Sequence, residues 1–416
     1  MGNKTRDEQT INFRIMKDSI RNYVRIGTIY YRLSEYINRY GISTIRREKW
    51  DIRTIKEDFG NRGADDIEKY AGFTLVPDNR NYKKIIDDRW NLYAPFAHKS
   101  DKGDFKHTEG FLRHIFGEQY DIGIKYLQCL YLHPKQALPV LALVSKERQT
   151  GKSTFLDWIT AIFGDNTVVV DAKNIKSEFN GVYAKANIIG IEETFIDKSD
   201  TIEKIKSIST QKTMTVNEKQ VQHYSIPFFG KIIMNSNNED KFIKIDDQEI
   251  RFFVRKISVP DKGNHNILND MIEEIPSFLY HLETLPPIDF SKSRMVFTAE
   301  ELRNETLANV KEESKSWLHK ELKESFQDYF DNSQSNSKYL HVTPTDIKEK
   351  WFHNNSQVQK NYIKTVLRNE FGFIQIDKVE RYSPFQESSK TGRPYIVPKS
   401  MFVKDSEEIK SEELPF

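Results

Sequence analysis

The sequence predicts an α/β protein with a parallel central sheet, a helical N-terminal region and a separate small C-terminal domain. Two observations carry the central part of this prediction. The apolar run Leu138–Val144 is typical of a strand buried on both faces, and Gly151-Lys152-Ser153 follows it directly before a helical segment. The third observation is the order of helix, helix, strand, turn and strand over residues 343–397, which indicates an independent domain.

Length and charge bound the class of protein. A chain of 416 residues is long enough for two or three domains, and its net charge is only +2. The charge is uneven: residues 1–50 hold 11 Lys/Arg against 5 Asp/Glu, residues 341–404 sum to about +5, and residues 151–260 balance near zero. Basic flanks around a neutral centre would suit a motor core with nucleic-acid-facing attachments. Ordinary solvated faces explain the same charges.

Cysteine usage and hydropathy exclude several classes. The single cysteine, Cys129, lies in the apolar stretch 126–131 and indicates a core residue, and a lone thiol forms no internal disulfide. The run 137–144 is too short to span a bilayer. The N-terminus has no apolar signal core, and Arg6 stands where myristoylation needs Ser or Thr. We therefore expect a soluble, cytoplasmic protein with no membrane partner.

Composition and periodicity divide the chain into six segments. Apolar residues at helical spacing predict a basic, mostly helical region over 1–87, and two amphipathic helices at 111–116 and 122–131 lead into the central domain. The expected segments are 1–87, a helical lead-in over 88–136, the core over 137–290, a helical linker over 291–338, a small domain over 339–404 and a flexible tail over 405–416.

Within the core, strand candidates alternate with helical segments. After the run at 138–144 we expect a helix over 152–162 and further strands at 168–170, 186–191 and 231–234. Alternation of this kind is typical of a layered α/β architecture.

Residues 145–154 resemble a phosphate-binding loop. The consensus G-x-x-x-x-G-K-[ST] lies between a strand and a helix, so that loop and helix amides hold phosphate oxygens. The predicted ATP contacts are Gln149, Thr150, Gly151, Lys152, Ser153 and Thr154. Lys152 would reach the outer phosphates and the Ser153 hydroxyl would bind Mg²⁺. One position departs from the consensus, because Lys146 stands where the first glycine is expected.

About 40 residues further on, the strand candidate 187–191 ends in two acids. Nucleotide hydrolysis needs one carboxylate near Mg²⁺ and another to activate the attacking water. We assign Glu192 to the metal and Glu193 to the water. The alternative is that the two acids only open a surface loop.

Two later segments complete the predicted site. The strand 231–234 runs into Asn235-Ser-Asn-Asn238, from which a polar side chain could orient the water, although the same residues also favour a plain turn. Arg251 follows, and its guanidinium could reach a γ-phosphate held by a neighbouring subunit. The alternative for Arg251 is an Arg–Glu pair at the domain edge.

The C-terminal domain has the outline of a winged helix. Helix-start residues open a helix over 343–352, a second helix covers 357–371, and strands at 373–376 and 395–397 would form a hairpin. Lys360, Lys364 and Arg368 lie at i, i+4 and i+8 on one face of the second helix. DNA contact and protein docking both remain open for this face.

The ordered set of motifs resembles the superfamily 3 helicases, specifically the helicase part of phage and plasmid primase–helicase proteins of the poxvirus type. The resemblance runs through the Gly-Lys-Ser-Thr loop, the strand ending in Glu-Glu, a Lys-bearing segment, a strand ending in Ser-Asn and Arg251-Phe252, and it covers roughly residues 88–285. It implies an AAA+-like ATPase core that binds ATP and Mg²⁺. Each motif alone is weak, and the order of the set is specific.

The resemblance assigns roles residue by residue. It makes Lys152 and Ser153 nucleotide and Mg²⁺ contacts, Glu192 and Glu193 the acidic pair, Asn237 the polar sensor and Arg251 an arginine finger. The family also carries a hairpin whose basic residue projects into the ring channel. Residues 213–220 fit that place, with Lys219 as the DNA-contacting lysine, and an ordinary exposed hairpin lysine is the alternative.

The family implies a homo-hexameric ring on single-stranded or forked DNA, in the cytoplasm of a bacterial host. No acidic metal pair precedes residue 137, so a separate primase or polymerase would be needed. The expected function is an ATP-dependent DNA helicase for a phage or mobile element. A nucleotide-regulated initiator or adaptor without processive unwinding is the second reading. A small-molecule kinase explains less, since it leaves the two strand ends and the terminal domains unused.

Overall fold

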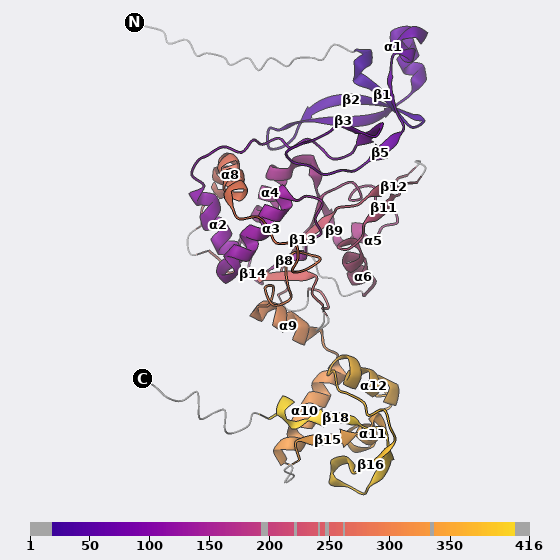
Figure 1. Ribbon diagram of the computed structural model, residues 1–416, viewed down its shortest axis with the longest axis vertical. Coiled ribbons are helices and arrows are strands. Elements are labelled where there is room, and N and C mark those ends of the chain that lie inside the picture. The colour runs from indigo at the N-terminus through magenta and orange to yellow at the C-terminus, as the bar shows by residue number, and fades with distance from the viewer. Residues whose placement is uncertain are drawn as a thin grey trace. The chain divides into compact units, whose positions relative to one another are not determined.

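The computed structural model describes residues 19–192, 199–219, 223–239, 242–245, 249–260, 263–332 and 337–403. The chain divides into two compact units (Figure 1). The first unit joins residues 1–242 to 250–304, and the second joins 243–249 to 305–416. Each unit has its own hydrophobic core and is described by itself.

A five-stranded parallel sheet forms the centre of the first unit (Figure 1). Its order is β14-β8-β13-β10-β9, and every neighbouring pair is parallel. The strands are β8 (Val140–Val144), β9 (Thr167–Asp171), β10 (Ile188–Glu192), β13 (Lys231–Ser236) and β14 (Phe252–Lys256). Parallel strands need crossover connections and cover on both faces, which explains why β8 and β13 are buried throughout their length.

The predicted strands of the core are confirmed, with small shifts at their ends. The helix expected over 152–162 is α4 (Lys152–Phe163). Strand β14 was missed, because the basic residues Arg251 and Arg255 interrupt the short apolar run Phe252–Val254. Only pairing with β8 shows that this run is a strand.

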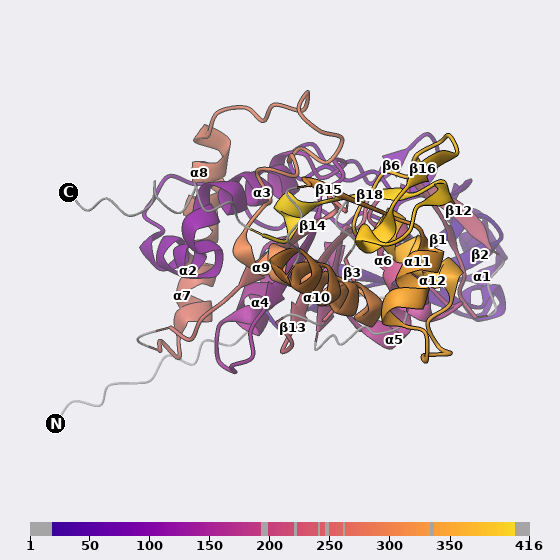
Figure 2. The ribbon, with the colours of Figure 1, turned by 90° about the horizontal axis from the view of Figure 1, so that it is seen from below.

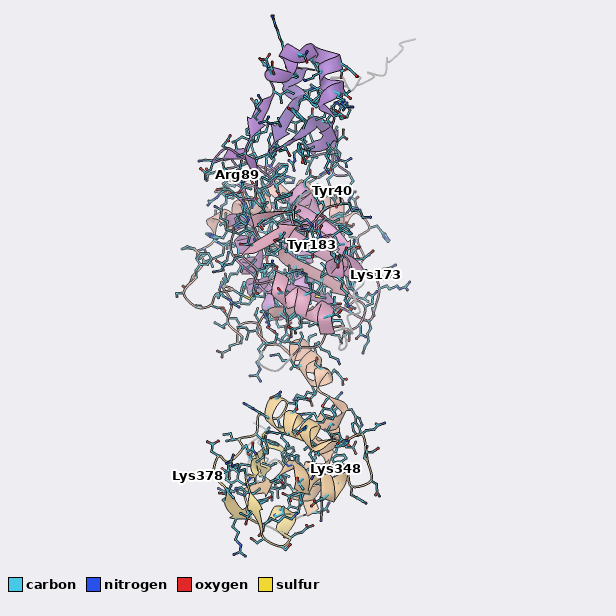
Figure 3. All side chains as sticks on the ribbon, turned by 90° about the vertical axis from the view of Figure 1, so that its right-hand side faces the viewer. Tyr40, Arg89, Lys173, Tyr183, Lys348 and Lys378 are labelled. Carbon is cyan, nitrogen blue, oxygen red and sulfur yellow. The ribbon has the colours of Figure 1, made fainter. Side chains whose placement is uncertain are left out.

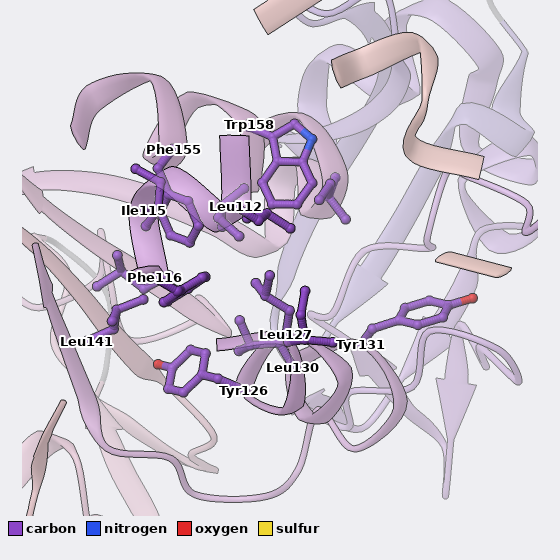
Figure 4. Close-up of a cluster of buried hydrophobic side chains, with 14 of the residues drawn as sticks. Leu112, Ile115, Phe116, Tyr126, Leu127, Leu130, Tyr131, Leu141, Phe155 and Trp158 are labelled. Atoms are coloured by element: carbon purple, nitrogen blue, oxygen red, sulfur yellow. The ribbon is translucent and has the colours of Figure 1, made fainter. Parts of the chain in front are cut away.

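Helices α2 (Lys106–Phe116), α3 (Tyr120–Leu132), α7 (Ile267–Glu273) and α8 (Ile275–Thr284) pack together beside the sheet (Figures 1 and 2). The two expected lead-in helices are thus confirmed. Figure 4 shows the aromatic and aliphatic side chains at this junction, with Phe116 and Trp158 among them. Both are fully buried, and truncating such an aromatic residue typically costs about 3–5 kcal/mol.

Three further elements flank the sheet. They are α5 (Ala172–Lys176), which carries the Lys173 labelled in Figure 3, α6 (Ser199–Ile208), and the antiparallel hairpin of β11 (Thr213–Val216) and β12 (Tyr224–Pro227). The hairpin expected around residues 213–220 is present and extends beyond that range, since β12 begins at Tyr224.

The expectation of a mostly helical N-terminal region is wrong for its described part, which is mainly β-structure (Figure 1). Two sheets have the orders β3-β2-β1-β4 and β5-β7-β6. Their strands are β1 (Tyr23–Ile26), β2 (Ile29–Ile37), β3 (Ser43–Trp50), β4 (Glu68–Tyr70), β5 (Gly72–Thr74), β6 (Ile85–Ile86) and β7 (Arg89–Asn91), and the α-helix of this region is α1 (Ile52–Asp65).

Alternation explains why these residues form strands. Val24, Ile26 and Tyr31 point to one face and pack with Trp90, whereas Tyr23 lies on the other face against α1. Gly27, at φ 61°, provides the turn between β1 and β2. Aromatic and β-branched residues at period two outweigh the apparent helical spacing.

The second unit contains α9 (Glu305–Ser314), α10 (Trp317–Asn332), β15 (Tyr339–Val342), α11 (Pro344–Trp351), α12 (Lys360–Asn369), β16 (Glu380–Tyr382), β17 (Lys390–Gly392) and β18 (Tyr395–Pro398). Strand β15 pairs antiparallel with β18, and β16 pairs with β17. Lys348 and Lys378, labelled in Figure 3, belong to this unit. The segment expected as a strand at 373–376 lies along one edge of β18 and forms the isolated bridge from Gln375 to Tyr395, whereas β15 pairs with the other edge of β18.

The boundary placed at residue 339 lies too late in the chain. Helix α10 carries Leu318, Leu322, Phe326 and Phe330 at intervals of four residues, and all four belong to the core of the second unit. Residues 291–304 are all described and contain no helix, so the expected helical linker is not a single element. The helix start at Thr343 is confirmed as a capping box, in which Asp346 accepts the Thr343 N–H at 2.9 Å.

Candidate functional site

The predicted phosphate loop connects the carboxyl end of β8 to the first residue of α4. Two of its residues have left-handed backbone, Gln149 at φ 58° and Gly151 at φ 94°. A Cβ on residue 151 would lie 3.0 Å from Cε2 of Phe111, so glycine suits both the conformation and the space. The N-terminal turn of α4 then points its amides toward the loop, as an anion site requires.

Lys152 is the central cation of this loop. Its Nζ donates to the carbonyl oxygens of Ser145 and Glu147 at 3.3 and 3.2 Å, and to Oγ1 of Thr150 at 3.2 Å. The residue is buried, and burial lowers the pKa of its ammonium, an effect that the carboxylates of Glu147 and Glu239 oppose. The loop therefore wraps around a positive charge.

Lys146 does not distort the loop. The positive φ values of the loop fall at Gln149 and Gly151, so position 146 needs no glycine for its backbone conformation. Instead, the Lys146 N–H donates to Oε1 of Glu239 at 3.0 Å. The departure from the consensus is thus accommodated by a carboxylate from another strand end.

The end of β10, with Glu192, and the polar end of β13 both lie at the carboxyl-terminal end of the sheet, as the loop does. Strand β13 lies between β8 and β10, with Ser236 level with Val144 and Met234 level with Ile191. The Ser145 N–H donates to the Ser236 carbonyl at 3.1 Å. At about 4.8 Å per strand, Glu192 on β10 lies two strands, or about 10 Å, from the loop strand.

The predicted site residues differ in how the structure places them. Glu192 is half-buried beside Asp171, and Asn237 follows β13 in an exposed bend. Glu193 lies outside the described residues. Across the described ranges, no three His, Cys, Asp or Glu side chains come together as a metal site. Ser153 and Glu192 would therefore hold Mg²⁺ only together with water and phosphate oxygens, as this ion prefers.

Arg251 lies at the amino-terminal end of the parallel strands, opposite the end that carries the loop. It precedes β14, and its carbonyl accepts the N–H of Val140 at the start of β8 at 2.8 Å. Its Nη1 donates to the Lys206 carbonyl near the end of α6 at 3.3 Å. Within one chain, the length of β8 separates Arg251 from the loop.

The predicted DNA-contacting residues are all exposed. Lys219 follows β11, and its Nζ lies 5.5 Å from the ring centroid of Phe179. In the second unit, Lys360, Lys364 and Arg368 lie on the exposed face of α12, whose other face contributes to the core.

A cavity of about 790 Å³ adjoins the loop, and sequence reasoning missed it. The loop and α4 contribute Gln149, Thr150, Gly151 and Thr154 to its lining, and α2 contributes Lys106, His107, Gly110, Phe111 and His114. The remaining lining residues are Val259, Pro260, Gly263, Asn264, His265, Ile267 and Leu268. The His114 Nε2 lies 3.0 Å from the Thr150 carbonyl. Residues 107, 110, 111 and 114 follow helical spacing, which was the available signal.

Sequence reasoning also missed Arg255 on β14. It is buried, and its Nη1 donates to Oε1 of Glu118 at 2.6 Å and to Oε1 of Gln119 at 2.8 Å. These bonds tie the junction between α2 and α3 to the sheet. Because the partners come from distant parts of the chain, spacing alone does not reveal them.

Comparison with known proteins places this fold. A family described as of unknown function (DUF5906) matches residues 143–252, which contain the loop and the two strand ends. No curated protein matches the chain. Among solved structures, the apo structure of NrS-1 C terminal region (305-718) is 16% identical and has a TM-score of 0.58, with 88% of this chain and 96% of that chain covered.

Two other apo structures of the NrS-1 C terminal region match this chain with similar values. The A form matches with the same values, and the A form of residues 305–718 is 15% identical at a TM-score of 0.56. At this identity the likeness defines a shared fold, a mixed α/β architecture around a parallel sheet. Within the part of the chain that the structure describes, every helix falls short of the length and apolar character of a membrane span.

Proposed function

We propose that the protein is an ATP-dependent, ring-forming DNA helicase of a phage or mobile-element replication system. The observation that carries the proposal is the strand order. It brings the loop after β8, Glu192 at the end of β10 and the polar end of β13 to the carboxyl-terminal end of the sheet, and it leaves Arg251 at the amino-terminal end. Phosphate binding and hydrolysis require the loop, a carboxylate and a polar side chain at the same end of the sheet. An arginine at the other end suits action on a neighbouring subunit.

In the proposed mechanism, the loop amides, Lys152 and the N-terminus of α4 bind the triphosphate. Ser153 and Glu192 would hold Mg²⁺, which supplies charge neutralisation at the β- and γ-phosphates when bound. Glu193 would accept a proton from the attacking water, and Asn237 would orient that water. The cavity beside Phe111 and His114 has the size of a small-molecule site and adjoins the loop, so the nucleoside part of the nucleotide would lie there.

DNA contact is assigned to two surfaces. Lys219 on the β11–β12 hairpin would grip phosphates without reading sequence. The exposed row Lys360, Lys364 and Arg368 on α12 would contact DNA through a winged-helix-like domain. Support for this domain type comes from the helices α11 and α12 followed by the β16–β17 hairpin.

The proposal is tested by measuring ATP hydrolysis with and without single-stranded DNA, together with unwinding of a forked duplex. Lys152→Ala should abolish both activities, because it removes the charge at the centre of the loop. Lys173→Ala on α5, an exposed lysine outside the site, is the matched control and should leave both intact. Normal hydrolysis without unwinding of any fork would exclude a helicase.

The alternative function, a nucleotide-regulated initiator, makes a different prediction. Hydrolysis would be too slow to drive movement, and site-specific duplex binding would depend on α12. Loss of that binding in Lys364→Glu, without detectable unwinding by the wild-type protein, would favour the initiator.

A further inference from the structure

Glu239 is a buried carboxylate that follows β13 and reaches the first residue of the phosphate loop. Its side chain is 5% exposed. Oε1 accepts the backbone N–H of Lys146 at 3.0 Å, and Oε2 lies 2.9 Å from Nζ of Lys256 and 3.7 Å from Nζ of Lys146. The carboxylate therefore binds one backbone amide and two ammonium groups.

These partners keep the carboxylate ionised. Burial alone would raise the pKa of Glu239, but the Lys146 amide and the Lys256 ammonium outweigh burial and hold the pKa below its usual range. The charge also acts on the loop itself, since Glu239 partly offsets the fall in the pKa of Lys152. A fixed negative charge thus stands at the start of a loop that would bind an anion.

The contacts of Glu239 connect three neighbouring strand ends. Lys146 follows β8, Glu239 follows β13, and Lys256 is the last residue of β14. The Ser145 N–H to Ser236 carbonyl bond lies alongside the same junction. The segment that carries Asn237 is therefore tied to the beginning of the loop through Glu239.

We propose that Glu239 is a positioning residue of the phosphate loop: it holds the Lys146 amide at the position where the consensus loop has glycine, and it holds the ammonium groups of Lys146 and Lys256 beside the loop. The nucleotide part of this inference rests on the proposed function. Its structural part does not, because the hydrogen bond to Lys146 is a property of the protein without ligand.

Glu239 holds two ammonium groups, those of Lys146 and Lys256, at the start of the loop. The side chains of Lys146 and Lys256 are 65% and 55% exposed, so Glu239 holds both at the protein surface beside the loop. Without Glu239 these long side chains lose their common anchor. Nucleotide affinity should then fall even though Glu239 itself carries the wrong sign to bind phosphate.

The test uses the full chain and three variants. Glu239→Ala removes the acceptor and the charge, whereas Glu239→Gln keeps an acceptor for the Lys146 amide and removes only the charge. Glu301→Ala is the matched control, because the Glu301 carboxylate accepts the Thr298 N–H at 2.8 Å and lies 3.5 and 3.8 Å from the Nζ atoms of Lys125 and Lys292. That cluster repeats the chemistry of Glu239 with residues outside the loop.

Hydrogen exchange of residues 145–151 is measured first, without nucleotide. Glu239→Ala should speed exchange of the Lys146 amide about tenfold, because a charge-assisted hydrogen bond is lost. Glu239→Gln should show a smaller change, and Glu301→Ala should leave the loop unchanged. Equal exchange of the loop in wild type and Glu239→Ala would overturn the proposal, as would an equal effect of Glu301→Ala.

Binding of a fluorescent, non-hydrolysable ATP analogue is measured second. Both Glu239 variants should bind about tenfold more weakly than wild type, with thermal stability monitored alongside. Unchanged affinity in both would overturn the role in nucleotide binding. Failure of the wild-type protein to bind the analogue would defeat the proposed function, and the exchange experiment would still decide the positioning role.

Discussion

Replacing Arg251 tests the proposed ring most directly. The Arg251 carbonyl accepts a hydrogen bond from the Val140 N–H at the amino end of β8, whereas the phosphate loop begins after Val144 at the other end. Four residues of strand at about 3.3 Å each separate these levels by about 13 Å, and the loop adds further distance. The guanidinium also donates to the Lys206 carbonyl near the end of α6. Arg251 should therefore serve a neighbouring subunit's site.

The expected magnitude follows from the role. An arginine that stabilises transition-state charge in phosphoryl transfer contributes about a thousandfold or more to kcat. Arg251→Ala should lower DNA-stimulated ATP hydrolysis by that factor while nucleotide affinity stays near the wild-type value. If Arg251 only held α6 in place, Arg251→Ala would instead lower thermal stability and nucleotide affinity together.

Subunit mixing separates action within a chain from action between chains. Arg251→Ala and Lys152→Ala should each be inactive alone, and an equimolar mixture should recover roughly a quarter of wild-type hydrolysis, because about one interface in four pairs an intact Lys152 with an intact Arg251. Mixing either variant with the double variant completes no interface and is the negative control. A mixture that exchanges subunits and stays inactive would refute the reasoning.

Two further predictions concern single lysines. Lys219→Ala should leave basal ATP hydrolysis near wild type and abolish its stimulation by single-stranded DNA, since the side chain lies on a hairpin outside the loop; stimulation that persists would remove Lys219 from the DNA path. Lys231 is fully buried, and burial lowers the pKa of its ammonium to about 7. The unfolded chain then binds the extra proton between about pH 7 and the ordinary lysine value of about 10.4, so the free energy of unfolding should rise with pH across that window. Lys231→Met should remove this rise in denaturant unfolding measured at several pH values, and an identical slope in both proteins would contradict the assignment.

The core strands could be predicted from local sequence because their burial leaves a local signal. Leu138–Val144 and Ile232–Met234 are apolar runs, and burial on both faces of the sheet accounts for them. The helix after Gly151 and the capping box at Thr343 are equally local. The N-terminal sheets were not predicted, because aromatic residues such as Tyr23 and Tyr30 fit both helical and alternating patterns until pairing decides.

For the candidate site, local sequence identified the parts and left their arrangement open. Lys152, Glu192 and Arg251 each follow from motif chemistry and spacing. The resemblance to superfamily 3 helicases assigned them roles, and those roles remain predictions to be tested. The cavity lined by Phe111 and the hydrogen bonds of Arg255 were not predicted, because each joins segments more than thirty residues apart.

The phosphate loop shows where the division falls. The sequence by itself determined that a Gly-Lys-Ser-Thr loop joins a buried strand to a helix, since strand burial, backbone freedom at Gly151 and helix initiation are properties of neighbouring residues. Only the tertiary structure decided how the loop tolerates Lys146, because the Glu239 carboxylate that holds the Lys146 amide comes from the end of β13. A hydrogen bond between residues 93 positions apart requires the sheet to form first, when parallel pairing brings the ends of β8 and β13 side by side.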